Sequence, residues 1–160
     1  MDTLQQIKEQ ICDVCHKMWQ LGWVAANDGN VSAKLPDGRI ILIRQFRYAF
    51  MKDFLEIPAG KIDEGEDILT CARRELSEEI GYDCENMKYL GKICPSCGCM
   101  NEVIHLYVAE NMVERQLAPD EDEDIQTVIV TKEEALAMIS SGEIDDAKTI
   151  CALLRYACNV

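Results

Sequence analysis

The sequence predicts a layered domain of the α/β or α+β class, in which strands interleave with helices. Two observations favour this fold class. Several segments repeat apolar residues every three or four positions, as amphipathic helices do, and short runs rich in β-branched residues lie between them. The chain has 160 residues, of which 48% are hydrophobic and 28% charged. These values suit one globular domain and argue against two full ones.

The first predicted helix covers residues 4–21. Its apolar positions lie three or four residues apart, at Leu4, Ile7, Ile11, Val14, Met18 and Leu21. Thr3 and Gln6 form a capping-box pattern before the helix, and Gly22 is a typical stop after it. The narrow apolar stripe must be buried on its own domain or on a second copy of the chain, so a homodimer is a hypothesis.

The remaining elements follow in order along the chain. The segment VSAKL-PDG-RIILI, residues 31–43, predicts a hairpin around a Pro-Asp-Gly turn. A loop containing EIPAG then leads to a helix over residues 67–80. Further strands are expected at 87–93, 102–110 and 125–131, and two closing helices at 132–140, ended by Ser141-Gly142, and at 146–157.

Composition limits the class of partner and the compartment. The formal net charge of −13 argues against binding to nucleic acids or anionic membranes, whose charge it would repel. No stretch approaches the eighteen or so apolar residues of a membrane span, and the N-terminus lacks the pattern of an export signal. The nine cysteines are an odd number and suit reduced thiols, so no structural disulfides and a cytoplasmic location are expected.

The helix over residues 67–80 crowds negative charge. Glu75, Glu78 and Glu79 fall within five positions, where like charges on one helix surface repel each other. Arg74 is placed to pair with Glu78 across one turn. Three such carboxylates offer the hard oxygen ligands that Mg²⁺ or Mn²⁺ prefers, and a bound ion would turn the repulsion into attraction. Taken alone, the pattern also fits a solvated acidic face.

A longer spacing pattern surrounds this helix. From Gly60 the chain runs through Glu66 to RELSEEIGY, residues 74–82. This resembles the Nudix box, G-x5-E-x7-R-E-U-x-E-E-x-G-U, in which U is a bulky aliphatic residue. Only Tyr82 departs from it. The resemblance implies a mixed β-sheet sandwiched between helices, to which the helix over residues 4–21 would be an addition.

The resemblance also implies roles for the residues of the box. Glu75, Glu78 and Glu79 would hold Mg²⁺ or Mn²⁺, together with a backbone carbonyl at Ala59 or Gly60. Arg74 would orient the glutamates, and Glu66 would brace the loop. Metal-assisted attack of water on a pyrophosphate is the chemistry that such a site performs.

The surrounding segments are similar to one branch of this family. IRQFRYAF, EIPAGKIDEGED and GEIDDAKTICALL look like the ADP-ribose pyrophosphatase branch, over about residues 38–157. This implies Mg²⁺-dependent hydrolysis of a nucleoside diphosphate sugar, above all ADP-ribose to AMP and ribose 5-phosphate. Arg44, Arg47 and Glu56 would then contact the small-molecule substrate, although either arginine alone also fits a surface salt bridge.

Later segments carry further expectations from this branch. A glutamate in the loop APDEDEDI would be the general base, with Glu121 and Glu123 as candidates and Glu123 slightly favoured, although the loop also fits a solvated acidic turn. Ser96 and Gly98 stand where the branch has a Ser-Pro-Gly turn near the substrate, with a cysteine replacing the proline. Glu102 matches a glutamate of the branch, whereas His105 is expected to pack within a strand.

Residues 1–37 form a separate part in this interpretation, with 38–160 as the Nudix domain. Their helix and hairpin entry resemble the N-terminus of the class II aldolase and epimerase family, in which Gly29, Asn30 and Ser32 would cradle phosphate. The H-x-H zinc ligands of that family are missing from the chain, so aldolase activity is not expected. The join between the two parts is placed at 31–43.

Several alternatives remain open. CDVCH, residues 12–16, has the spacing of a heme c attachment site, and CPSCGC, residues 94–99, looks like half of a zinc site. A pyrophosphatase for another nucleoside diphosphate derivative is a second reading of the function. A non-catalytic protein that binds a nucleotide sugar is a third.

Overall fold

The computed structural model describes residues 27–47, 49–98, 100–115 and 125–159. The predicted helix over 4–21, the CDVCH segment, Glu121 and Glu123 lie outside these ranges. In β1 the side chains of Gly29, Asn30 and Ser32 also lie outside the description.

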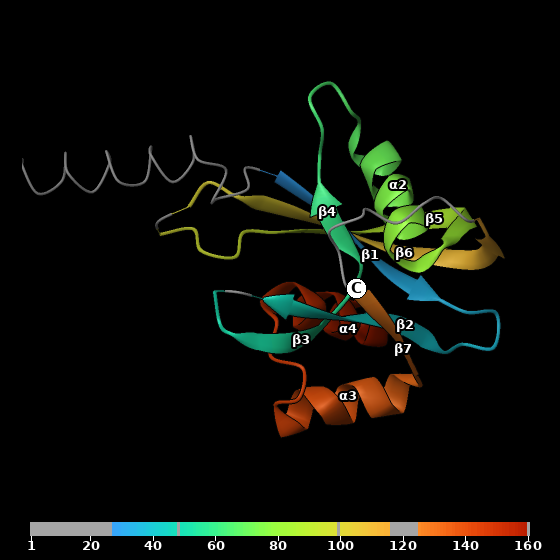
Figure 1. The fold of residues 1–160 in the computed structure, drawn as a ribbon, viewed down its shortest axis with the longest axis vertical. Coiled ribbons are helices and arrows are strands. Elements are labelled where there is room, and N and C mark those ends of the chain that lie inside the picture. Colours follow the sequence, from blue (N-terminus) through green and yellow to red (C-terminus); the bar gives the residue numbers. More distant parts are fainter. Residues whose placement is uncertain (1–26, 48, 99, 116–124, 160) are drawn as a thin grey trace, which may run out of the picture.

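A mixed β-sheet forms the centre of the molecule (Figure 1). Within the described residues its seven strands are β1 (Asn27–Lys34), β2 (Ile40–Arg47), β3 (Lys52–Glu56), β4 (Ala59–Lys61), β5 (Tyr82–Ile93), β6 (Val103–Glu114) and β7 (Ile125–Val130). The main path runs β3-β2-β1-β6-β5, while β4 pairs with β1 and β7 pairs with β2. Strands β1 and β6 are parallel, and the other pairs are antiparallel.

The predicted hairpin is present between β1 and β2. Ala33 pairs with Ile41, and the Leu35 N–H donates to the Arg39 carbonyl at 2.8 Å across the turn. Gly38 has φ +88°, a left-handed conformation that glycine adopts without strain. This explains why the Pro-Asp-Gly signal marked the turn correctly.

Three helices confirm the sequence prediction. They are α2 (Ile68–Ile80), α3 (Lys132–Ser141) and α4 (Ala147–Cys158). Asp67 caps the start of α2 by accepting from the N–H groups of Leu69 and Thr70, and Gly81 ends it with φ 72°. A Thr131–Glu134 capping box starts α3, and Gly142 ends it as expected.

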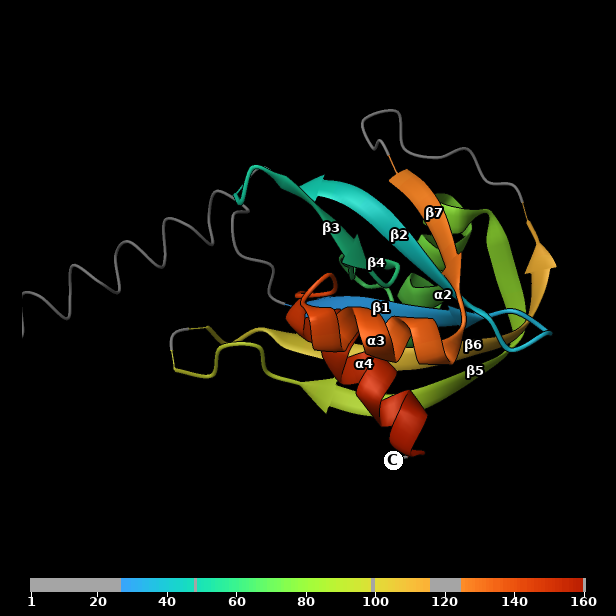
Figure 2. The same ribbon diagram turned by 90° about the horizontal axis from the view of Figure 1, so that it is seen from below.

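Helices cover both faces of the sheet (Figure 2). Along β2, Ile41 and Ile43 pack with α2, whereas Ile40 and Leu42 pack into the cluster that contains α3 and α4. This alternation follows from the two-residue period of a strand. The predicted sandwich of a mixed sheet between helices is therefore confirmed.

The strands differ from the sequence prediction in number and in bounds. β1 begins at Asn27 rather than at residue 31, β2 continues to Arg47 rather than ending at residue 43, and β6 continues to Glu114 rather than ending at residue 110. β3 and β4 occupy the stretch around EIPAG for which a loop is expected. These two short strands lie on either side of Pro58, and they form because β3 pairs with β2 and β4 pairs with β1. β5 begins at Tyr82 rather than at residue 87, because the chain enters the sheet directly after the Gly81 cap. Its first residues include Asp83, a residue type that is rare in strands.

The described cysteines are free thiols, and Cys71 and Cys84 are buried. Among the described residues, no helix is both long and apolar enough to cross a membrane.

Candidate active site

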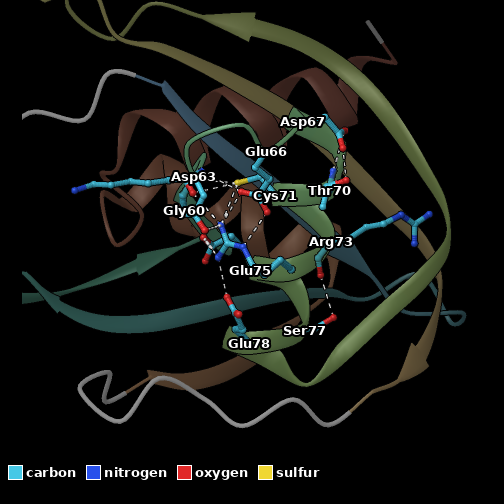
Figure 3. A network of polar contacts seen from close by, with 12 residues as sticks. Gly60, Asp63, Glu66, Asp67, Thr70, Cys71, Arg73, Glu75, Ser77 and Glu78 are labelled. Atoms are coloured by element: carbon cyan, nitrogen blue, oxygen red, sulfur yellow. Dashed lines mark hydrogen bonds and ion pairs between the residues drawn. The ribbon is translucent and has the colours of Figure 1, made fainter.

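Arg74 holds the acidic residues of α2 together. Its guanidinium is 3.0 Å from Glu66, 2.7 Å from Glu75 and 2.9 Å from Glu78, and it also donates to the Lys61 carbonyl at 2.9 Å. Figure 3 shows Glu75 and Glu78 on α2 near Gly60, and Glu66 in the segment before the helix. Arginine suits this task because its planar fork donates to several oxygens at once. The expected pair of Arg74 and Glu78 is present, and Glu66 also accepts from the Asp63 N–H of the preceding loop at 3.1 Å.

Gly60 lets the Glu75 carboxylate lie against the backbone. A Cβ atom at residue 60 would stand 1.8 Å from the Glu75 Cδ and 1.9 Å from its Oε1. Any side chain at residue 60 would therefore displace the Glu75 carboxylate from this position. The arrangement places a carboxylate beside the peptide units of Ala59 and Gly60.

Glu79 joins the same backbone segment from the next turn of α2. The Ala59 N–H donates to its Oε2 at 2.8 Å. Because β4 pairs with β1, this hydrogen bond fixes the helix against the sheet. Ala59, Gly60 and the three glutamates are thus gathered in one place.

The network shifts the affinity of its members for protons. Hydrogen bonds to Glu66, with those to Glu78 and Glu75, raise the pKa of Arg74, so that its charge is permanent. Its hydrogen bonds in turn lower the pKa of Glu66. Burial, together with Glu66 and Glu75 nearby, raises the pKa of Cys71 to about 12. The thiol of Cys71 is therefore neutral at physiological pH.

A second charged network lies at the end of β3. Glu56 is only 2% exposed and accepts two hydrogen bonds from Arg47, each 2.7 Å long. Lys148 of α4 also pairs with Glu56, and with Asp146 at 3.1 Å. Burial alone would raise the pKa of Glu56, but the hydrogen bond from Arg47 and the charge of Lys148 outweigh it, so the pKa lies below its ordinary value.

The start of α4 places Lys148 in this network. Asp146 caps the helix by accepting from the Thr149 N–H at 2.9 Å and from its hydroxyl at 2.6 Å. The Thr149 Oγ1 accepts in turn from the Ile57 N–H at 3.0 Å. This buried chain ties the first turn of α4 to the segment between β3 and β4.

Both networks border one cavity of about 890 Å³. Glu75, Glu78 and Arg74 line it from α2, and Gly60 and Lys61 line it from β4. Arg47 and Lys148 contribute positive charge from β2 and α4, and Phe50 and Met100 add apolar surface. The cavity therefore combines carboxylates, cations and apolar groups, which is typical of a ligand site.

The cavity includes some of the residues singled out in the sequence and not others. Ala59, Gly60, Arg74, Glu75, Glu78, Arg47 and Glu102 line it. Glu56 lies beneath Arg47 rather than at the surface of the cavity, and Arg44 lies within the sheet, opposite Leu55 and Gln126. Ser96 and Gly98 belong to the turn after β5, from which Pro95 reaches the cavity instead.

Sequence reasoning missed Lys148. A lysine in the first turn of a helix opposes the macrodipole, which favours acidic residues there. Its presence two positions after the N-cap Asp146 was therefore a signal that it serves another purpose. His105 is a strand residue as expected, with its Nδ1 3.1 Å from the Tyr89 hydroxyl.

The donor groups gathered here are of the types that a divalent metal ion takes, although Arg74 and the Ala59 N–H engage them in this structure. The cradle at Gly60, which a Cβ would fill, brings the Glu75 carboxylate against the backbone of that residue, and carboxylate and carbonyl oxygens suit Mg²⁺ or Mn²⁺. Within the described ranges, no three carboxylate, imidazole or thiol groups are arranged to hold a metal ion. In this structure Arg74 engages Glu75 and Glu78, and the Ala59 N–H engages Glu79.

The structure is a mixed sheet between helices, with an acidic helix beside a cavity. Comparison with known protein families identifies the class of domain that has this architecture. The family model of the NUDIX domain matches residues 29–153. The chain therefore belongs to the NUDIX family, whose hydrolases generally use divalent metal ions. The match begins before residue 38, and the division at residues 37 and 38 stays a prediction.

Several curated proteins are similar to this chain. A methanol dehydrogenase activator of Bacillus methanolicus is 41% identical over 119 residues, which are 73% of this chain and 64% of that protein. An ADP-ribose pyrophosphatase of Bacillus subtilis is 38% identical over 125 residues, 77% of this chain and 68% of that protein. A GDP-mannose pyrophosphatase of Yersinia enterocolitica is 37% identical over 131 residues, with shares of 76% and 68%. The chain thus spans about two thirds of the length of these relatives.

Solved structures support the fold. The crystal structure of an ADP compounds hydrolase superposes with a TM-score of 0.76 at 23% identity, covering 82% of this chain and 70% of that one. A NUDIX hydrolase from Nitrosomonas europaea gives a TM-score of 0.68 at 16% identity, with shares of 85% and 90%.

Proposed function

We propose that this protein hydrolyses the pyrophosphate bond of a nucleoside diphosphate sugar, above all ADP-ribose, with Mg²⁺ or Mn²⁺ as cofactor. The products are AMP and ribose 5-phosphate. The cavity carries this proposal, because carboxylates of α2 line it together with Arg47 and Lys148. A diphosphate is attracted directly by the two cations, and by the carboxylates only through metal ions.

The proposed metal ligands are Glu75, Glu78 and Glu79 with the carbonyl of Ala59 or Gly60. When bound, a divalent ion supplies charge neutralisation and a more acidic water. Arg74 keeps the carboxylates in position through its hydrogen bonds to Glu75 and Glu78. Gly60 admits the Glu75 carboxylate to the backbone.

The substrate is held by the other side of the cavity in this proposal. Arg47 and Lys148 donate to phosphate oxygens, and Glu56 positions both of them from below. Phe50, which is 70% exposed, and Met100 offer apolar surface to the base. Glu102 lines the cavity too. Arg44, Ser96 and Gly98 do not line the cavity, so they would contact only a part of the substrate that extends beyond it.

Hydrolysis requires that a proton be removed from the attacking water. The water oxygen forms a bond to one phosphorus, the bridging P–O bond breaks, and the leaving phosphate departs. We assign the removal of the proton to Glu121 or Glu123, which lie outside the described residues. Comparing Glu121→Gln with Glu123→Gln decides between them, since only loss of the base removes most of the rate.

A GDP-mannose pyrophosphatase among the relatives supports a second candidate substrate. GDP-mannose shares the diphosphate and the sugar but differs in its base. A panel of ADP-ribose, GDP-mannose and dinucleotides, incubated with Mg²⁺ and resolved by chromatography, identifies the preferred substrate.

The same panel tests the reaction itself. Wild type should release a nucleoside monophosphate, and Glu79→Gln should lower the rate about a hundredfold, which is roughly 3 kcal/mol of barrier. Tight binding without turnover of any compound in Mg²⁺ or Mn²⁺ would instead identify a non-catalytic nucleotide-sugar binding protein.

A cytoplasmic location and a homodimer are further parts of the proposal. Free thiols are typical of reducing compartments. The exposed apolar side chains of Phe46, Phe50 and Met51 near the β2–β3 connection support self-association. Light scattering that finds only monomers at high concentration would remove the dimer.

A further inference from the structure

A second cavity, the basic cavity, lies at the opposite end of α4 from Lys148. Its volume is about 190 Å³, and Arg155, Tyr156 and Asn159 line it from the end of the helix. Leu90 of β5 and Val108 of β6 form apolar wall. It shares no described lining residue with the larger cavity. The two are therefore separate sites.

The charge of this cavity is opposite to that of the whole chain. Four basic side chains line it, Lys34, Lys88, Lys132 and Arg155, against the single described carboxylate of Glu110. They come from β1, β5, α3 and α4, while the chain has a formal net charge of −13. Gathering like charges from four elements costs free energy unless an anion compensates them.

Arg155 is held at this site by the backbone. Its guanidinium donates to the Leu90 carbonyl at 2.7 Å and to the Lys92 carbonyl at 3.4 Å. Gly91, with φ +113°, makes room for it, since a Cβ there would stand 2.1 Å from Nη1. Its position is thus fixed before any ligand arrives.

Lys34 is also held in position. Its Nζ lies 3.4 Å from the Glu110 Oε1 and 5.8 Å from the centre of the Tyr156 ring. Lys88 and Lys132 are exposed, so their long side chains can turn towards a ligand. Packing against β5 accounts for Arg155, and the pair with Glu110 accounts for Lys34. Neither contact gives a reason for Lys88 and Lys132 to line the same cavity.

We propose that the basic cavity binds a small phosphate-bearing anion, either inorganic phosphate or a phosphate monoester. Several cations around a confined space match the charge and the oxygen acceptors of a phosphate group. The volume admits a phosphate group with a few further atoms and falls below the range of sites for larger ligands. A nucleoside diphosphate sugar does not fit there.

The test is calorimetric titration with inorganic phosphate, and separately with ribose 5-phosphate, at low salt in the presence of EDTA. EDTA removes binding that depends on metal ions in the larger cavity. Arg47 and Lys148 still line that cavity, and any probe bound to them would be unaffected by changes in the basic cavity. Wild type should bind one probe molecule per chain, and the probe that binds more tightly identifies the source of the phosphate. The variant Lys88→Ala/Lys132→Ala should weaken that binding about tenfold or more.

A matched double variant controls for overall charge. Lys52→Ala/Lys92→Ala removes the same charge from side chains that do not line the basic cavity, and its affinity should stay within about twofold of wild type. Circular dichroism confirms that both variants fold. The proposal is overturned if wild type binds neither probe, or if the two double variants lose affinity equally or not at all.

Discussion

The carboxylate of Glu75 and the backbone of Gly60 are in direct contact, with space between them for no side chain. A Cβ at residue 60 would stand 1.8 Å from the Glu75 Cδ. Fourteen residues of sequence lie between the two positions, yet β4 and α2 bring them together. The contact therefore brings Gly60, the first residue of the spacing pattern, against Glu75 of the acidic helix.

Gly60→Ala should displace the Glu75 carboxylate and lower kcat about a hundredfold, because an added methyl group occupies the position of the carboxylate. Steady-state kinetics with ADP-ribose measure this effect. Gly38→Ala is the control, since it introduces a side chain at a positive φ in a distant turn with nothing within 4 Å. It should lower stability slightly and leave kcat unchanged; an equal loss of kcat in both variants would refute the role of the contact.

Lys148→Met should raise KM about tenfold with a smaller effect on kcat, because Lys148 lines the cavity and pairs with Glu56 and Asp146 rather than with the proposed metal ligands. The control is Lys52→Met, a lysine on β3 that pairs with Asp145 outside the cavity. Kinetics over a range of substrate concentrations separate the two constants. If KM is the same in both variants, Lys148 does not contact the substrate.

Glu56→Gln should destabilise the fold by about 3 to 5 kcal/mol at neutral pH, because it leaves Arg47 and Lys148 without their buried partner. The pKa of Glu56 is lowered in the folded protein from its ordinary value of 4.5. Its contribution is therefore complete above that value and disappears as pH falls through the folded pKa. Denaturant unfolding from pH 7 to pH 3 should show the difference from wild type shrinking below about pH 4.5; a constant difference would contradict this assignment.

The thiols should differ in reactivity. Cys94, Cys97 and Cys158 are exposed, whereas Cys71 and Cys84 are buried and burial raises the pKa of each. Only the thiolate reacts with iodoacetamide. Mass spectrometry of the native protein at pH 8 should find the three exposed cysteines alkylated and the two buried ones unmodified until the chain is denatured. Early labelling of Cys71 would show that α2 does not pack on β4 as described.

Local signals predicted the elements that they can specify. The hairpin at Gly38 and the helix over residues 67–80 were predicted because turn chemistry and apolar period lie within these segments. Strands β3 and β4 were missed because their partners in β2 and β1 are separated from them along the chain. A strand of three residues has no period of its own.

The candidate site was predictable where its residues lie close together in the sequence, and not where distant segments meet. Gly60, Glu66 and Arg74 follow a fixed spacing, so their meeting around Glu75 and Glu78 was expected. The pairing of Glu56 with Lys148 spans 92 positions and depends on how α4 packs against β3. Nothing in the local sequence fixes that packing, although a lysine in the first turn of α4 was a usable sign.

The central claim is that the carboxylates of α2 bind divalent metal ions. Mn²⁺ titration followed by electron paramagnetic resonance tests it without relying on turnover. With a non-hydrolysable methylene analogue of ADP-ribose present, wild type should remove free Mn²⁺ from solution, and Glu75→Gln/Glu79→Gln should lose that binding. If wild type takes up no Mn²⁺ even with the analogue, or the double variant binds it equally well, the proposed chemistry has no metal at its centre and is wrong.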